Sequence, residues 1–201
     1  IIIYTIEKFQ KHPMIDAIEV VCLEGWYDIL KAYAEQFGIA KLKYVISGGN
    51  SSQESIKIGL ENLKNICNDG DIIIIHDGIR PMVDDNIITS CIETCESNGN
   101  GVTAYPVYEQ IFETKDGKTT DKYIPRESLR IVQTPQAYKY KEILDVYIEG
   151  FEKNIGIHGS SYANTLMTDM GKKLYFSAGS TKNIKITTKD DIAIFKAMIS
   201  F

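Results

Sequence analysis

The chain has 201 residues, of which 44% are hydrophobic and 24% are charged. This balance is that of one folded domain of ordinary size, and it argues against intrinsic disorder. The net charge at pH 7 is -5. An acidic chain without a basic cluster is a poor candidate for nucleic-acid binding, so an anionic substrate has to be met by a few individually placed cations.

The opening stretch IIIYTIEKF carries Glu7 and Lys8 before an apolar run reaches the length of a signal peptide or a membrane span. We therefore expect no membrane insertion. The four cysteines, at positions 22, 67, 91 and 95, form no CxxC pair and have no nearby histidine. Small buried residues are a better interpretation than a metal site, and free thiols favour a cytoplasmic location.

Apolar periodicity predicts alternating helices and strands along the first half of the chain. Helices are expected at residues 1–10, 26–38, 51–66 and 84–97, and strands at 16–24, 41–47, 71–77 and 101–107. Ser51 and Glu54 have the spacing of a capping box, and Gly38 closes the second helix. The alternation implies one α/β domain over residues 1–201, with a mainly parallel sheet covered by helices on both faces.

The alternation breaks at residues 108–130. Asp116 and Gly117 lie between two alternating segments and predict a hairpin turn, so this stretch is expected to project from the body as a β-arm. Beyond it we expect strands at 130–136, 173–178 and 183–187, and helices at 141–153, 162–170 and 189–199. Thr188 and Asp191 have the spacing of a cap for the last helix.

The stretch DIIIIHDGIRP, residues 71–81, is the most informative. Four consecutive isoleucines indicate a strand buried on both faces, and open α/β sheets bind ligands at the carboxyl ends of their strands. There Asp77 is suited to accept from polyol hydroxyls or meet a metal, Gly78 to let a ligand approach the backbone, and Arg80 to form a fork with a phosphate. The alternative is a buried histidine with an aspartate that caps the next helix.

A glycine-rich connection, GGNSSQES, joins the second predicted strand to the third helix. Gly48 and Gly49 permit a flat ligand to approach the backbone, and free amides at the helix start suit the acceptors of a base or phosphate, with Asn50 and Ser55 nearby. A plain capped connection explains the same letters.

Two further stretches carry cations. In NIKITT the alternation separates Lys185 from its isoleucine neighbours, so this side chain points either to solvent or into a cleft. In PRESLRIVQTPQ, Arg126, Arg130 and Thr134 follow the arm closely. They form either an anion site or ordinary solvated charge.

These motifs, in this order, resemble the cytidylyltransferases that make CDP-activated polyols: GGN with IKIGL, then HDGIRP, then VQTPQ, then NIKITT. That family includes 2-C-methylerythritol 4-phosphate and ribitol 5-phosphate cytidylyltransferases. The resemblance runs from Ile1 to the end of the chain. It implies a Rossmann-like nucleotidyltransferase fold, Mg²⁺-dependent transfer of CMP from CTP to a polyol phosphate with loss of pyrophosphate, and a homodimer joined through the arm.

The resemblance also implies roles for single residues. Gly48, Gly49, Asn50 and Ser55 would meet the cytosine, and Asp77 with Gly78 would lie at the nucleotide sugar and the incoming polyol. The residues implied to hold the polyol phosphate are Arg80, Thr134 and Arg126, the last reaching across the dimer. Lys185 would neutralise phosphate charge as the substrate attacks the α-phosphorus, so its role is electrostatic.

The chain departs from the family pattern in three places. The family begins with a glycine-rich loop, whereas IIIYTIEKF resembles the helix that follows it, so we expect roughly 25 to 35 further residues before Ile1 in the native polypeptide. Glu109 and Gln110 replace a usual Asp-Thr pair, and residues 160–164 are SSYAN in place of a TDxAS-type stretch. These two departures concern which polyol is used.

The favoured substrate is 2-C-methyl-D-erythritol 4-phosphate, because the phosphate-binding motifs are preserved together. The alternatives are ribitol 5-phosphate, another polyol or sugar phosphate, and a non-catalytic dimeric nucleotide-binding protein. A Rossmann dehydrogenase is disfavoured, because no G-x-G-x-x-G follows a strand.

Overall fold

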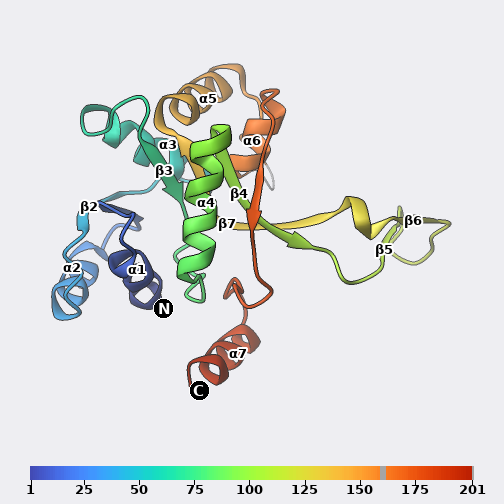
Figure 1. The fold of residues 1–201 in the computed structure, drawn as a ribbon, viewed down its shortest axis with the longest axis horizontal. Coiled ribbons are helices and arrows are strands. Elements are labelled where there is room, and N and C mark those ends of the chain that lie inside the picture. The colour runs from blue at the N-terminus through green and yellow to red at the C-terminus, as the bar shows by residue number, and fades with distance from the viewer. Residues whose placement is uncertain (159–161, 201) are drawn as a thin grey trace.

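The computed structural model describes residues 1–158 and 162–200. Its central sheet has the strand order β3-β7-β4-β8 (Figure 1). The strands are β3 (Ile72–Ile75), β7 (Arg130–Lys139), β4 (Asn100–Pro106) and β8 (Phe176–Ala178). β7 is antiparallel to β3 and β4, whereas β4 and β8 are parallel. Three strands therefore point the same way, as expected of a mainly parallel sheet, and β7 is reversed because it returns from the arm beside β4.

A separate two-stranded parallel sheet is formed by β1 (Ile18–Cys22) and β2 (Leu42–Ser47). The connection between them is α2 (Tyr27–Gln36), so this is a β-α-β unit. The buried side chains of Leu30 and Ala34 pack with Val20 and Val45 of the strands. Gly38 follows the helix with φ of +66°, the left-handed conformation that the predicted helix end requires.

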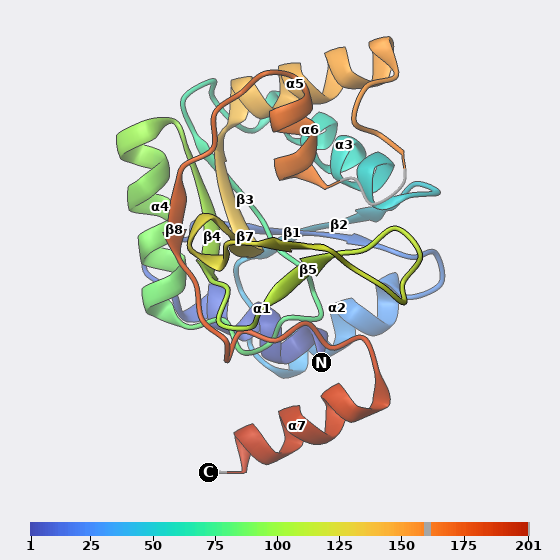
Figure 2. The same cartoon turned by 90° about the vertical axis from the view of Figure 1, so that its right-hand side faces the viewer.

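Helices cover both faces of the four-stranded sheet, as predicted (Figure 2). One side carries α1 (Ile2–Lys11) and α4 (Asp85–Asn98), and the other carries α3 (Ser52–Asn62), α5 (Tyr140–Lys153) and α6 (Ala163–Asp169). The isoleucines of β3 alternate between the two layers. Ile72 and Ile74 pack toward α1 and α4, and Ile73 and Ile75 toward the other layer. All four remain partly accessible because β3 is an edge strand of its sheet.

The predicted arm is present and leaves the body of the protein (Figure 1). It consists of the antiparallel strands β5 (Ile111–Glu113) and β6 (Lys122–Ile124), followed by the 3-10 turn η2 (Arg126–Ser128). The turn is longer than a two-residue hairpin. The Asp116 carboxylate organises it by accepting from the backbone amides of Lys118 and Thr119 at 2.9 and 2.8 Å.

Two predicted strands near the C-terminus differ from the structure. The strand expected at 173–178 is limited to Phe176–Ala178, because the Asn100 side chain takes the backbone groups of Lys173 and Tyr175. The strand expected at 183–187 does not form. Side chains hold this segment instead, and its pairing with residue 79 is one bond from the Ile186 amide to the Ile79 carbonyl at 2.9 Å.

The chain ends in α7 (Lys189–Ile199), which begins with the predicted capping box of Thr188 and Asp191. Figure 2 shows this helix set apart from the layers around the sheet. Its Phe195 packs edge-on against Tyr4 of α1, with ring centroids 5.4 Å apart.

A further 3-10 turn, η1 (Leu63–Asn65), extends α3. Within residues 1–158 and 162–200, every helix is too short or too polar to cross a bilayer.

Candidate active site

A cluster of charged side chains lies just beyond the carboxyl end of β3. Arg80 Nε donates to Asp77 Oδ2 at 3.0 Å, and Lys185 Nζ lies 3.4 Å from Asp77 Oδ1. Lys185 comes from the segment before α7, 108 positions along the chain. Two motifs that the sequence singled out, HDGIRP and NIKITT, thus meet at the Asp77 carboxylate.

Thr134 of β7 completes this arrangement from the neighbouring strand. Its Oγ1 accepts from the Asp77 backbone amide at 3.0 Å, and its carbonyl accepts from Asn183 Nδ2 at 2.9 Å. Its peptide bond to Pro135 is cis. Thr134 therefore joins the end of β3 to the segment that carries Lys185.

Arg80 is held on a second side, because its guanidinium also donates to the Asn183 carbonyl at 2.8 Å. That carbonyl accepts from Gln133 Nε2 as well, at 2.9 Å. Asn183 is fully buried and Gln133 nearly so. Sequence reasoning did not assign either residue, although both lie inside motifs that it singled out.

Charge pairing controls the ionisation of Asp77. Burial alone would raise its pKa, but Lys185 and Arg80 together outweigh that effect and hold the pKa below its ordinary value. Asp77 is therefore a carboxylate at neutral pH, and the cluster of one anion and two cations carries a net positive charge. Such a cluster suits a phosphate group that approaches from solvent.

His76 lies beneath the cluster and is neutral. Burial lowers its pKa to about 4, against a weaker opposing contribution from its hydrogen bond to the Arg80 carbonyl. That bond, from Nε2, is 3.2 Å long, and the ring packs against Phe9 of α1 at a centroid distance of 4.9 Å. The other ring nitrogen, Nδ1, is buried without a hydrogen-bond partner.

Gly78 lies against α1. A Cβ at this position would lie 2.6 Å from Cδ1, the flexible end of the Ile2 side chain, and the Gly78 carbonyl accepts from Thr5 Oγ1 at 2.9 Å. The absence of a side chain thus lets α1 lie close to the loop that follows β3. Ligand approach to this glycine, which the sequence suggested, stays a prediction.

The glycine-rich connection closes on the start of α3. Ser55 Oγ accepts from the Gly49 amide at 3.1 Å, and Glu54 Oε2 accepts from the Asn50 amide at 2.6 Å. Ser51 Oγ caps the helix by accepting from the Glu54 amide at 3.1 Å. The capping pair is therefore present, with Glu54 reaching one residue further back than a standard box. A Cβ on Gly49 would lie 2.4 Å from Cβ of Glu54.

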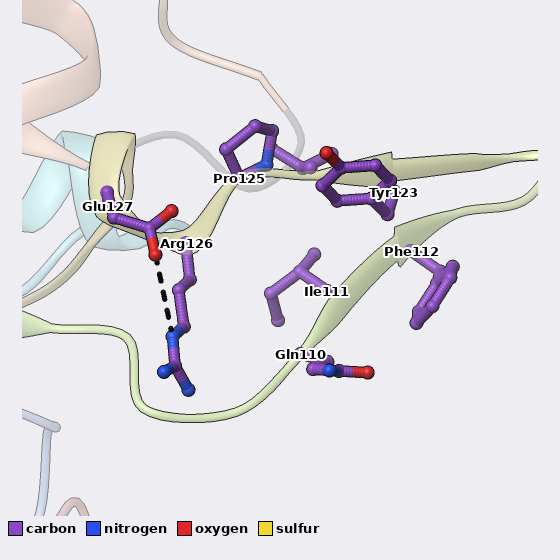
Figure 3. Close-up of a pocket in the computed structure, with 8 residues that line it drawn as sticks. Gln110, Ile111, Phe112, Tyr123, Pro125, Arg126 and Glu127 are labelled. Carbon is purple, nitrogen blue, oxygen red and sulfur yellow. Dashed lines mark ion pairs between the residues drawn. The ribbon is translucent and has the colours of Figure 1, made fainter.

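Arg126 is not part of the charged cluster in this chain. It lies at the base of the arm, where its guanidinium donates to the Tyr108 carbonyl at 2.7 Å and lies 3.8 Å from the Glu127 carboxylate. Figure 3 shows it at one end of a hollow of about 480 Å³ on the arm. The hollow is lined by Gln110, Ile111, Phe112, Tyr123, Ile124, Pro125, Arg126 and Glu127. Arg130 also stays at this base, bonded to the carbonyls of Glu127 and Leu129.

Tyr162 is a third residue that the sequence left without a role. Its ring centroid lies 5.5 Å from Lys185 Nζ. Its carbonyl accepts from Gln53 Nε2 of α3 at 3.3 Å. No local signal in the sequence identifies this contact. Tyr162 belongs to the SSYAN stretch, whose first two residues lie outside the described part of the chain.

The residues of the charged cluster fit a metal ion that is bound mainly by substrate phosphates better than one that is bound by protein side chains alone. In the described part of the chain, no group of three or more His, Cys, Asp or Glu side chains forms a metal cage. Asp77 is the carboxylate that the site offers, and both of its oxygens face cations. Mg²⁺ commonly takes one or two protein carboxylates and completes its shell with substrate phosphates and water.

Comparison with known proteins identifies the family. The family model described as 2-C-methyl-D-erythritol 4-phosphate cytidylyltransferase matches residues 1–200. The chain belongs to this family. Its members are CTP-dependent nucleotidyltransferases, so the enzyme class and the Rossmann-like fold expected from the motifs are confirmed.

Two curated relatives within the family carry different names. A ribitol-5-phosphate cytidylyltransferase of Lacticaseibacillus paracasei is 52% identical over 99% of this chain and 85% of its own length. A 2-C-methyl-D-erythritol 4-phosphate cytidylyltransferase of Clostridium acetobutylicum is 34% identical over 96% of this chain and 81% of its own length.

The fold of the family is also seen in solved structures. The crystal structure of 4-diphosphocytidyl-2C-methyl-D-erythritol synthase from Anaerococcus prevotii superposes with a TM-score of 0.87 at 23% identity, covering 100% of this chain and 86% of that one. At this identity the superposition establishes the architecture alone.

Proposed function

We propose that this cytidylyltransferase transfers CMP from CTP to ribitol 5-phosphate and releases pyrophosphate. The observation that carries the choice of polyol is the 52% identity to a relative with that name over nearly the whole chain. The motifs alone favoured 2-C-methyl-D-erythritol 4-phosphate, which stays the second candidate because the family model and a 34% identical relative carry that name.

The proposed reaction uses the cluster around Asp77. An oxygen of the polyol phosphate attacks the α-phosphorus of CTP, and a new P–O bond forms as the bond to the bridging oxygen breaks. The electrons of that bond leave with pyrophosphate. Lys185 stabilises the charge that develops on the α-phosphate oxygens, while Arg80 and Thr134 hold the polyol phosphate. Asp77 keeps both cations in place and accepts from the hydroxyls of the nucleotide sugar or polyol.

The cytosine is proposed to bind at the connection before α3. The sequence suggested free amides there, but the amides of Gly48, Gly49 and Asn50 each donate to a group within the protein. The base would therefore meet the carbonyls of this loop and the Asn50 side chain. Backbone groups recognise a base edge through hydrogen bonds whose positions are set by the fold, so the rigidity of this loop favours selectivity for one base.

Mg²⁺ is proposed to accompany the triphosphate, held by phosphate oxygens and water, because both oxygens of Asp77 are already paired with cations. When bound, the ion neutralises phosphate charge and supports the departure of pyrophosphate. The four free thiols support an enzyme of the reducing cytoplasm.

A homodimer joined through the arms is part of this proposal. Phe112 and Tyr123 face each other across the hairpin, and their exposed fractions are 54% and 68%. A two-stranded ribbon does not bury such side chains by itself. A second arm that covers them would also bring Arg126, which contacts only its own arm among the residues described here, toward the partner's cluster.

The test measures CTP-dependent pyrophosphate release by the full-length protein with Mg²⁺, using ribitol 5-phosphate and 2-C-methyl-D-erythritol 4-phosphate in parallel. A higher kcat/KM with ribitol 5-phosphate supports the proposal. The reverse preference replaces the polyol and keeps the reaction class. If neither polyol phosphate supports pyrophosphate release, the proposed function is contradicted.

The role of Lys185 has its own test, the Lys185→Ala variant. We expect kcat to fall on the order of 100-fold or more, the usual cost of removing one preorganised electrostatic group. Lys182→Ala is the matched control, because Lys182 lies in the same segment with its side chain exposed. Equal rates for the two variants would show that Lys185 is an ordinary surface lysine.

A further inference from the structure

The Lys185 ammonium has two neighbours of different kinds. One is the carboxylate of Asp77 at 3.4 Å, and the other is the ring of Tyr162, whose centroid lies 5.5 Å away. A cation within about 6 Å of an aromatic face is attracted by the ring quadrupole. The lysine therefore lies between an anion and an aromatic ring.

The peptide that carries this ring is fixed by hydrogen bonds. The Tyr162 amide donates to Thr165 Oγ1 at 2.7 Å, and its carbonyl accepts from the Leu166 amide at 2.9 Å and from Gln53 Nε2 at 3.3 Å. Gln53 is 2% exposed, and its Oε1 accepts from Tyr147 OH at 2.6 Å. Tyr162 is thus tied to α3, the helix that starts at the glycine-rich connection.

Packing does not require the Tyr162 side chain itself. The side chain is 48% exposed, whereas α6 is anchored by the buried Ala163, Leu166 and Met167. The ring is half-exposed, and its peptide is held at three points beside the Lys185 ammonium. Its position is therefore better explained by the contact with Lys185 than by packing in the core.

We propose that Tyr162 is a positioning residue that holds the Lys185 ammonium where the α-phosphate of CTP meets it. The inference rests on the proposed role of Lys185. An aromatic ring confines a cation without adding negative charge, whereas a second carboxylate beside Asp77 would repel the incoming phosphate. The ring also accepts no strong hydrogen bond, so the ammonium keeps its donors for phosphate oxygens.

The experiment compares Tyr162→Leu with Tyr162→Phe in steady-state pyrophosphate release by the full-length protein. Tyr162→Leu is expected to lower kcat roughly 3- to 10-fold with little change in the KM for CTP, the range that a partly exposed cation–π contact supports. Tyr162→Phe keeps the ring and is expected to retain most of kcat. Tyr33→Leu is the matched control, because Tyr33 is 49% exposed on α2, outside the site.

Two results would overturn the proposal: wild-type kcat in Tyr162→Leu, or equal losses in the Leu and Phe variants. Thermal unfolding shows whether the Leu variant is folded. If it is not, Tyr162→Met provides a second flexible, non-aromatic side chain for the same comparison.

A double-mutant cycle separates this inference from the proposed function. In the Lys185→Ala background, Tyr162→Leu should produce no further loss of kcat, because the ring no longer has a cation to hold. An equal loss in both backgrounds would overturn the positioning role. An unchanged kcat in Lys185→Ala alone would instead refute the role proposed for the lysine.

Discussion

The backbone amide of Asp77 donates a hydrogen bond of 3.0 Å to the hydroxyl of Thr134. This bond links the segment that follows β3 to the antiparallel strand β7, beside the charged cluster. It fixes the peptide of Asp77, and hence the carboxylate to which Arg80 and Lys185 are paired. One hydroxyl therefore positions three charged groups.

We expect Thr134→Val to disturb this arrangement, because valine matches the shape of threonine but leaves the Asp77 amide without its acceptor. The loss of a partner for this partly buried amide costs about 1–3 kcal/mol of stability, and a displaced cluster lowers kcat/KM roughly tenfold or more. Chemical denaturation and pyrophosphate release measure the two effects. Thr134→Ser keeps the hydroxyl and serves as the control. If serine and valine behave alike, the hydrogen bond is not what positions Asp77.

His76 predicts a pH dependence of folding. Its pKa is about 4 in the folded protein because the ring is buried, against about 6.5 when unfolded. Between these values the unfolded chain binds a proton that the folded chain does not, so the free energy of unfolding falls as the pH falls, by about 1.4 kcal/mol per unit from this residue. The contribution is fully present above pH 6.5 and is lost progressively down to about pH 4.

The measurement is urea unfolding at several pH values between 4 and 7 for wild type and His76→Gln. The variant should show a shallower loss of stability over this window, because glutamine does not titrate. His158→Gln is the control, since His158 is exposed. Parallel curves for wild type and His76→Gln would contradict a buried neutral histidine.

The sequence predicted much of the charged cluster because its residues follow regular elements. Asp77 and Arg80 follow a run of four isoleucines, Thr134 lies in a stretch predicted as a strand, and Lys185 lies in a stretch of apolar alternation. Elements of this kind bring strand ends to one edge of a sheet, so residues far apart in sequence meet without any local signal of their partners.

Other features depend on contacts that periodicity does not contain. The segment 183–187 alternates like a strand, yet the buried Asn183 bonds to Thr134 and accepts from Arg80 and Gln133, and these long-range bonds replace a ladder. The reversed direction of β7 follows from the path of the arm. The contact between Tyr162 and Lys185 joins a loop and a strand-like segment that share no pattern.

Gly49 offers a test of the glycine-rich connection. A Cβ on this residue would lie 2.4 Å from Cβ of Glu54 and 3.3 Å from its carbonyl carbon, so Gly49→Ala must shift the loop away from α3. We expect the KM for CTP to rise roughly tenfold or more, because displaced backbone groups no longer match the base. Gly70→Ala is the matched control, since a Cβ there meets no atom within 4 Å. An unchanged KM in Gly49→Ala would place the cytosine elsewhere.

The arm supplies the last prediction. Phe112 and Tyr123 form one exposed cross-strand pair, and each aromatic side chain buries about 150–250 Å² when covered. Placing two aspartates there, in Phe112→Asp/Tyr123→Asp, should weaken a dimer joined through the arms by roughly 100-fold or more, because charge would have to be desolvated at the interface. Sedimentation at micromolar concentration should then show monomers.

The activity of the double variant should fall in parallel, because Arg126 would no longer reach the cluster of the partner subunit. Leu23→Asp is the control, the same kind of substitution at one exposed apolar residue away from the arm. A double variant that stays dimeric, or a wild-type protein that is monomeric under the same conditions, would exclude assembly through the arm.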